Sequence, residues 1–147
     1  NKGAADGLRK KMAVITYEGV VGYILNTTAH YATVLVLTDH NAVIDALIQR
    51  TRARGISEGI GRDFAHIKYL QRTDDVQVGD LIVTSGFDNI FPKGFPIGKV
   101  TKVTKKNYGV TQSVEFKPVV DVNRLEEVLI VISPESPEKG PLKTSSL

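Results

Sequence analysis

The chain has 147 residues, of which 41% are hydrophobic, enough to bury the core of one domain or of two small ones. It contains no cysteine, which excludes a disulfide framework, a thiolate metal site and a cysteine nucleophile. Its 19 lysines and arginines are nearly balanced by 16 aspartates and glutamates, spread over both halves, so no nucleic-acid-binding surface is indicated.

Short apolar runs separated by turn residues open the chain. Residues 12–17, 20–26 and 33–38 are rich in β-branched and aliphatic side chains, a pattern typical of strands in an antiparallel sheet or barrel. Residues 33–37 have no polar face, which predicts a central strand buried on both sides. Four tyrosines are assigned to the core or to a barrel mouth: Tyr17, Tyr23, Tyr31 and Tyr69.

The segment 39–55 fits two structures. As a helix it would begin after Asp39 and end at Gly55, with its apolar residues on one side, and its residues alone favour this slightly. As a strand it would direct Ile44 and Ile48 to one face and Asp45 to the other. Both structures remain open from these residues.

The middle of the chain contains the expected domain boundary. A further strand is predicted at residues 66–70, and a polar connection follows at 73–79. We therefore expect a first domain over residues 1–75 and a second over 76–132, an arrangement that allows the last strand to return to the first domain.

Two more strands are predicted in the second domain. Residues 97–105 are strand-like, but Val100 and Val103 fall on opposite faces, which predicts a bulge. Val114 and Phe116 then alternate with polar residues, as in a half-buried strand.

The last part of the chain combines an apolar strand with a polar terminus. A one-turn capping box is expected at residues 123–126, before a strand at 128–132. Residues 133–147 contain prolines and few apolar side chains, which predicts a disordered tail.

Residues 79–100 carry the strongest backbone constraint in the chain, because prolines that fix φ and glycines that permit a positive φ interrupt a short strand and a loop. We assign a structural role to Gly79, Asp80, Thr84, Ser85, Gly86, Pro92, Gly94, Pro96 and Gly98. Large apolar side chains in the loop would either close a barrel or stay exposed and anchor a protein partner. The candidate partner-binding residues are Phe87, Ile90, Phe91 and Phe95, with Tyr108 at a later turn.

A serine hydrolase is the first alternative function. His30 or His40, Asp45 or Asp63, and Ser85 follow one another in the order of a chymotrypsin-like triad. However, Ser85 lacks the glycine-rich surround that forms an oxyanion hole, so we assign no catalytic residue. We expect Ser85 to be a turn residue whose hydroxyl binds nearby backbone groups.

Metal and cofactor sites are not indicated. The three histidines, His30, His40 and His66, have no paired ligand spacing, and the glycines do not follow the order of a dinucleotide-binding loop. Two basic groups are interpreted as solvated faces, with binding of an anionic partner as a secondary alternative: Arg50, Arg52 and Arg54, and Lys102, Lys105 and Lys106.

Two motifs resemble those of a known family. The run G-D-L-I-V-T-S-G-F at residues 79–87, followed by F-P-K-G-F-P-I-G-K-V at 91–100, is similar to the signature of the rod-shape-determining protein MreC family. The resemblance covers residues 1–132 and includes Asn1-Lys2-Gly3, Gly19-Val20-Val21-Gly22 and Lys117-Pro118.

This resemblance implies an all-β fold of two small antiparallel β-barrel domains, and on that basis we predict a strand within residues 39–55. It also implies a fragment on the periplasmic side of the cell membrane. The opening strands of the first barrel, a coiled coil and a single membrane-spanning helix would precede it.

The function implied by the resemblance is that of a non-catalytic scaffold in the cell-elongation machinery that synthesises peptidoglycan. The scaffold would self-associate as a dimer or filament and bind the elongation-specific penicillin-binding transpeptidase, with MreD and RodA in the same complex. No cofactor and no nucleic acid are expected. A secreted glycan-binding module is a further alternative.

Overall fold

The structure, a computed structural model, describes residues 2–106, 108–124, 129–132 and 141–145. Within them the chain is almost entirely β, as predicted. Besides two single turns of 3-10 helix, η1 (Ala4–Asp6) and η2 (Val122–Arg124), it forms the following strands: β1 (Ala13–Ile15), β2 (Val20–Thr27), β3 (Ala32–Val36), β4 (Val43–Ile48), β5 (Arg54–Gly61), β6 (Phe64–Gln71), β7 (Leu81–Thr84), β8 (Pro96–Thr104), β9 (Thr111–Pro118), β10 (Leu129–Ile132) and β11 (Pro141–Ser145).

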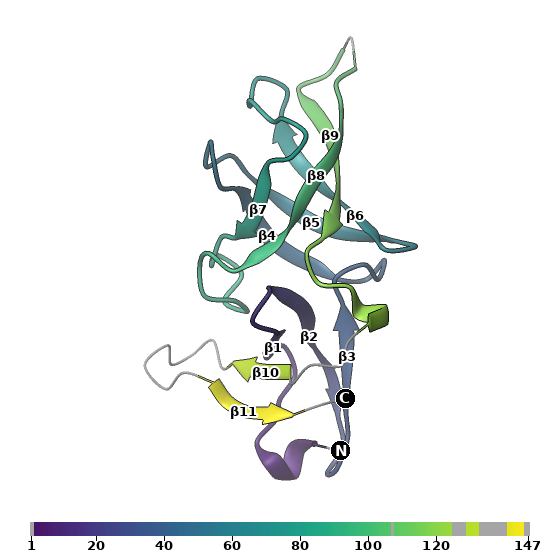
Figure 1. Ribbon diagram of the computed structural model, residues 1–147, viewed down its shortest axis with the longest axis vertical. Coiled ribbons are helices and arrows are strands. Elements are labelled where there is room, and N and C mark those ends of the chain that lie inside the picture. The colour runs from purple at the N-terminus through teal and green to yellow at the C-terminus, as the bar shows by residue number, and fades with distance from the viewer. Residues whose placement is uncertain (1, 107, 125–128, 133–140, 146–147) are drawn as a thin grey trace.

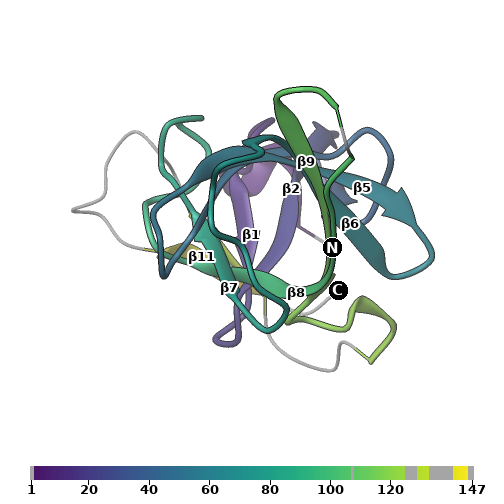
Figure 2. The ribbon, with the colours of Figure 1, turned by 90° about the horizontal axis from the view of Figure 1, so that it is seen from above.

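The strands make two antiparallel units stacked along the long axis of the molecule (Figure 1). One is a five-stranded sheet in the order β11-β10-β1-β2-β3, and the other is a closed barrel in the order β4-β5-β6-β9-β8-β7. Figure 2 shows the barrel strands seen from above, with β1 and β2 behind them. In the described residues neither helix is long and apolar enough to cross a membrane.

The segment 39–55 contains a strand, as the resemblance implied. Ile44, Ala46 and Ile48 are fully buried and belong to the barrel core, an alternation of period two that a helix would not bury. A tight turn then leads into β5, with the backbone N–H of Arg52 donating to the carbonyl of Ile48 at 2.8 Å. Arg52 has a positive φ of 66° there.

The expected domain boundary at residues 75 and 76 is wrong, because the barrel takes strands from both sides of it. The polar connection at 73–79 joins β6 to β7 within the barrel. Hydrogen bonds from β9 hold this connection in place. Gln112 of β9 donates through Nε2 to the carbonyls of Gln71 and Asp74 at 2.7 and 2.8 Å. The chain instead passes between the two units at residues 37–42 and again at 119–121.

Strand β3 is at the edge of the sheet, contrary to the prediction of a central strand. It pairs with β2 alone in the described part of the chain, and only Leu35 of its five residues is buried. An uninterrupted apolar run therefore did not indicate burial on both faces here.

The tail is partly ordered, so the prediction of disorder is wrong for residues 141–145. They form β11, which pairs with β10, and β10 in turn pairs with β1. Backbone hydrogen bonds make this pairing independent of the low apolar content that motivated the prediction. Residues 133–140 and 146–147, like the second half of the predicted capping box at 125–126, lie outside the described residues.

The bulge predicted from Val100 and Val103 is confirmed, since the pairing of β8 with β9 shifts register between Val100 and Lys102. In β9, Val114 and Phe116 are fully buried and their neighbours are more exposed, as predicted.

The two units share a hydrophobic core cluster, while a second cluster, which includes Met12, Val14 and Ile24, contains no residue of the barrel strands. Side chains of the sheet, such as Val20 and Tyr23, belong to the same buried cluster as the barrel residues. The Tyr23 hydroxyl accepts a hydrogen bond at 3.1 Å from the backbone N–H of Val43, the first residue of β4. At Gly19, a Cβ would lie 2.5 Å from the carbonyl oxygen of Pro96, so the backbones of the two units are in direct contact there. The units are therefore a single packed body.

Candidate functional site

The loop between β7 and β8, residues 85–95, is held by hydrogen bonds to Thr84. The Thr84 hydroxyl donates to the carbonyl of Pro92 at 2.7 Å and accepts from the N–H of Phe95 at 2.9 Å. The N–H of Gly94 donates to the Thr84 carbonyl at 2.8 Å, and the φ of Gly94 is 96°. Thr84 thus closes both ends of the segment 92–95, and the loop has one defined shape.

Asp88 joins this loop to the barrel. Its Oδ1 accepts from the N–H of Ile90 at 3.0 Å, and its Oδ2 accepts from the N–H of Asp45, on β4, at 3.0 Å. Because Asp45 and Asp88 are 43 positions apart, their pairing follows from the fold and has no local sequence signal.

The structure separates the five candidate partner-binding residues into two groups. Ile90 and Phe91 are 7% and 2% exposed and belong to the barrel core, and Phe95 packs against that core. Ile90 and Phe91 cannot meet a partner without unfolding the loop, whereas Phe95 is partly exposed. Phe87 and Tyr108, by contrast, are 66% and 75% exposed.

Phe87 is covered on one face by Arg54. The guanidinium carbon of Arg54 lies 3.9 Å from the centroid of the Phe87 ring, which is a cation–π stack. Asp45 holds the same guanidinium from the other side through two hydrogen bonds, with Nε to Oδ1 at 2.8 Å and Nη2 to Oδ2. Nη1 of Arg54 has no hydrogen-bond partner among the described residues. We refer to Phe87 and Arg54 together as the Phe87–Arg54 surface.

The carboxylate of Asp45 is stabilised in its charged form. Arg54, followed by the hydroxyl of Ser85, lowers the pKa of Asp45 against the opposing effect of burial. The charge on Asp45 therefore persists at neutral pH and fixes the position of Arg54.

Ser85 acts within this network. Its hydroxyl donates directly to Oδ1 of Asp45 at 2.9 Å and accepts from the N–H of Phe87 at 3.3 Å. In a catalytic triad a histidine would lie between the serine and the carboxylate. Here His66 contacts Glu58 at 3.4 Å and His40 lies against Gly61. The hydroxyl thus positions the loop, and its partners include a side chain as well as the expected backbone.

The other assigned structural residues have clear local roles. Gly79 and Gly86 have positive φ values of 94° and 84°. Pro96 begins β8, and a Cβ on Gly98 would lie 2.5 Å from the carbonyl oxygen of Lys117. Asp80 accepts from Nε of Arg50 at 2.9 Å, and Arg50 lowers its pKa.

Two of the three arginines in the predicted basic group are paired. Arg50 binds Asp75 and Asp80, and Arg54 binds Asp45. Sequence reasoning therefore missed Arg54 and Asp45 as parts of the site, because their partners come from other strands. In the described residues no cluster of three potential metal ligands occurs.

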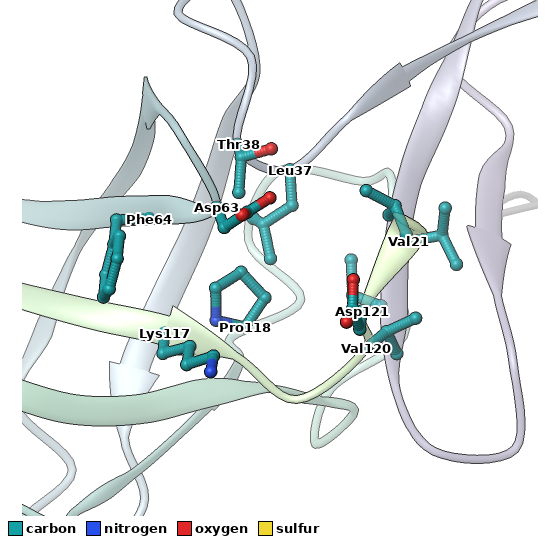
Figure 3. A pocket seen from close by; sticks show the side chains of 11 residues that line it. Val21, Leu37, Thr38, Asp63, Phe64, Lys117, Pro118, Val120 and Asp121 are labelled. Atoms are coloured by element: carbon teal, nitrogen blue, oxygen red, sulfur yellow. The ribbon is translucent and has the colours of Figure 1, made fainter. Parts of the chain in front are cut away.

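A second feature is a cavity of about 150 Å³ where the sheet meets the barrel (Figure 3). Its wall is mostly apolar, and Asp63, Lys117 and Asp121 lie at it (Figure 3). Asn123 of the returning segment donates through Nδ2 to Oδ1 of Asp63 at 2.9 Å, which connects that segment to the β5–β6 turn. The cavity opens to solvent at the junction between the units, since Asp63, Lys117 and Asp121 are exposed.

The fold and the loop define a class of protein: a double β-unit module with a rigid loop whose exposed aromatic ring stacks on a guanidinium from a neighbouring strand. The chain belongs to the MreC family, because the family model "Rod shape-determining protein MreC, barrel core" matches residues 1–132.

Individual relatives agree with this assignment. The cell shape-determining protein MreC of Haemophilus influenzae is 33% identical over 132 residues, covering 89% of this chain and 38% of that protein. The chain thus spans less than half the length of that relative.

Solved structures are similar over most of the chain. MreC from Pseudomonas aeruginosa has a TM-score of 0.83 at 30% identity, over 89% of this chain and 84% of that one. The major periplasmic domain of a protein described as the cell shape-determining filament MreC has a TM-score of 0.71 at 26% identity, covering 82% and 75%. A chain from the complex of penicillin-binding protein PBP2 with MreC of Helicobacter pylori has a TM-score of 0.67 at 16% identity, covering 80% and 74%, a likeness of fold alone.

Proposed function

We propose that this chain is the periplasmic core of a non-catalytic scaffold of the cell-elongation machinery, and that it binds the elongation-specific penicillin-binding transpeptidase through the Phe87–Arg54 surface. The proposal rests on one observation: a chain of the MreC family has an exposed phenylalanine stacked on an arginine. A solved structure of the same fold comes from a complex of MreC with a penicillin-binding protein, which supports a partner of that kind. An upstream membrane-spanning helix would place MreD and RodA in the same complex.

The surface has the chemistry of an interface centre. Aromatic residues and arginine are the side chains that most often dominate binding energy. Asp45 and Ser85 hold Arg54 and the loop in place before any partner arrives, so little conformational entropy is lost on binding. A scaffold with such a surface stabilises the partner conformation that it binds best.

Truncation of the aromatic ring tests the proposal. We expect Phe87→Ala in the full-length protein to weaken capture of the purified transpeptidase about 30-fold or more, as loss of an interface anchor does. Arg54→Lys should weaken it less, because lysine keeps the charge but not the planar stack on the ring. Surface plasmon resonance would measure both affinities.

Val78→Ala is the matched control, since Val78 is 68% exposed at a different part of the barrel and its truncation should leave the affinity unchanged. Capture that is equally strong with Phe87→Ala, in a variant whose circular dichroism is unaltered, would refute the assignment of this surface.

Self-association is the second part of the proposal, and we assign it to β3. A closed barrel offers no free edge, whereas β3 is an uncovered edge in the described part of the chain and carries no charge or proline. Edge strands of this kind pair with a strand of another copy through backbone hydrogen bonds. The related protein described as a filament supports such an assembly.

A lysine placed on this edge should oppose the pairing. Thr33 is exposed on β3, and we expect Thr33→Lys to convert an associating protein to monomers, because charged edge strands repel strand addition. Analytical ultracentrifugation would show the change. Gln77→Lys adds the same charge at an exposed position of the barrel and should leave the oligomer intact. An oligomer that resists Thr33→Lys would place the contact elsewhere.

A further inference from the structure

The end of the barrel farthest from the sheet carries a second surface, beside Tyr108. The hairpin that joins β8 to β9 projects there, at the top of Figure 1, away from both termini. A hollow of about 300 Å³ opens along it, lined by Thr104, Lys106, Tyr108, Gly109, Thr111, Gln112 and Ser113. It is separate from the Phe87–Arg54 surface, with which it shares no residue.

Gln112 forms part of the wall of this hollow. Gln112 is only 4% exposed, and its Oε1 has no hydrogen-bond partner among the described residues. The orientation of the amide is fixed, because Nε2 donates to the carbonyls of Gln71 and Asp74. Because Oε1 itself is closed to solvent, Gln112 forms a rigid part of the wall, and other groups of the hollow would meet a ligand.

The hollow combines neutral hydroxyl groups with one aromatic ring and one cation. Thr104, Thr111 and Ser113 supply the hydroxyls. The Lys106 ammonium lies 5.9 Å from the centroid of the exposed Tyr108 ring. The hydroxyls can bind hydroxyl groups of a ligand, the aromatic ring can pack on an apolar ring face, and the ammonium can bind a negative charge.

Tyr69 adds a second aromatic ring to the same end of the barrel. The pairing of β6 with β9 shifts register between Ile67 and Leu70, and Tyr69 lies within this irregularity. Tyr69 has a φ of 69°, an unfavourable conformation for a bulky residue, and its ring is 66% exposed. Strained residues of this kind gather at functional sites.

We propose that this hollow binds a saccharide that carries a carboxylate, with the sugar ring on Tyr108, the carboxylate on Lys106 and the sugar hydroxyls at Thr104, Thr111 and Ser113. An acidic peptide would use the cation but few of the hydroxyls. An anionic lipid surface would use the cations of the hairpin and not the hydroxyls of the hollow. The Lys106 ammonium forms no ion pair within the described part of the chain, and the Lys106 carbonyl accepts from Nε of Arg72 at 3.0 Å, which adds a second cation nearby.

Soluble fragments of bacterial peptidoglycan that retain their carboxylates are the probe, and chitotetraose, an uncharged oligosaccharide of N-acetylglucosamine, is the matched ligand. We expect isothermal titration calorimetry to show the charged fragments binding about tenfold more tightly than chitotetraose, since a charge-assisted hydrogen bond contributes about 1.5–3 kcal/mol. Lys106→Gln should remove that difference. Tyr108→Ala should weaken both ligands, by about two- to tenfold.

Two variants separate this surface from the scaffold function. Tyr31→Ala removes an equally exposed tyrosine from the sheet and should leave saccharide binding unchanged. Phe87→Ala should also bind the saccharide normally while losing the transpeptidase. The proposal is overturned if neither saccharide binds, if Lys106→Gln and Tyr108→Ala bind like the unaltered protein, or if a glutamate decapeptide or phosphatidylglycerol vesicles bind at this end and the saccharides do not.

Discussion

Phe91→Ala should lower the free energy of unfolding by about 3–5 kcal/mol, the usual cost of truncating a buried phenylalanine. Phe91 is 2% exposed and packs in the barrel core, so its removal leaves a cavity beneath the 85–95 loop. A loss of this size is a large part of the stability of a domain of this length. Urea denaturation followed by circular dichroism would measure it.

Phe87→Ala is the matched variant from the same loop. Its ring is two-thirds exposed and mainly contacts Arg54, so the cost should be about 0.5–1 kcal/mol, the value of an exposed cation–π pair. A similar loss of stability in both variants would show that the exposed ring also supports the fold, and would weaken its assignment as an anchor for a partner.

Gly59→Ala should also destabilise the protein, by about 3 kcal/mol or more. A Cβ at Gly59 would lie 2.2 Å from the carbonyl oxygen of Asp39 and the carbonyl carbon of Thr38. These are backbone atoms of the connection between sheet and barrel, so relief requires the strands to move, at or beyond the upper end of the usual cost of overpacking. Urea denaturation would again measure the loss.

Gly7→Ala separates steric clash from backbone preference. Gly7 has a φ of 90°, but no atom lies within 4 Å of its Cβ position, so alanine there should cost only about 1–2 kcal/mol of conformational strain. If Gly59→Ala proved as mild as Gly7→Ala, the contact between β5 and residues 38–39 would be looser than described.

Local sequence pattern accounted for the strands but not for their order. The bulge in β8 was predictable, because Val100 and Val103 could not share a face of a regular strand. The strand at β4 was not predictable from its own residues, since its apolar side chains suit both a helix and a strand. Closure of the barrel resolves the ambiguity by surrounding Ile44 and Ile48.

The prediction of the boundary between the units was wrong for a related reason. Polar residues at 73–79 are typical of a linker, but Asp74 accepts from the N–H of Gln71 at 2.9 Å and forms a turn inside the barrel. The true connections near residues 37–42 and 119–121 are partly apolar, because Leu37 and Ala42 pack in the shared cluster and Val120 packs in the second cluster.

The candidate site was found in part. Glycine and proline spacing located the 85–95 loop, and the exposed Phe87 and Tyr108 were among its candidates. Which aromatic side chains face inward depends on the barrel beneath them, so Ile90 and Phe91 could not be excluded from the sequence. Likewise, Asp45 and Arg54 meet only because β4 and β5 pair.

The continuous core between sheet and barrel has a geometric consequence. The contacts of Tyr23 and Gly19 oppose rotation of one unit against the other, so the fold sets the direction from the β3 edge to the Phe87 ring. Copies joined through β3 would repeat that direction with a regular pitch. Partners held by such an array would be arranged at even intervals along a line.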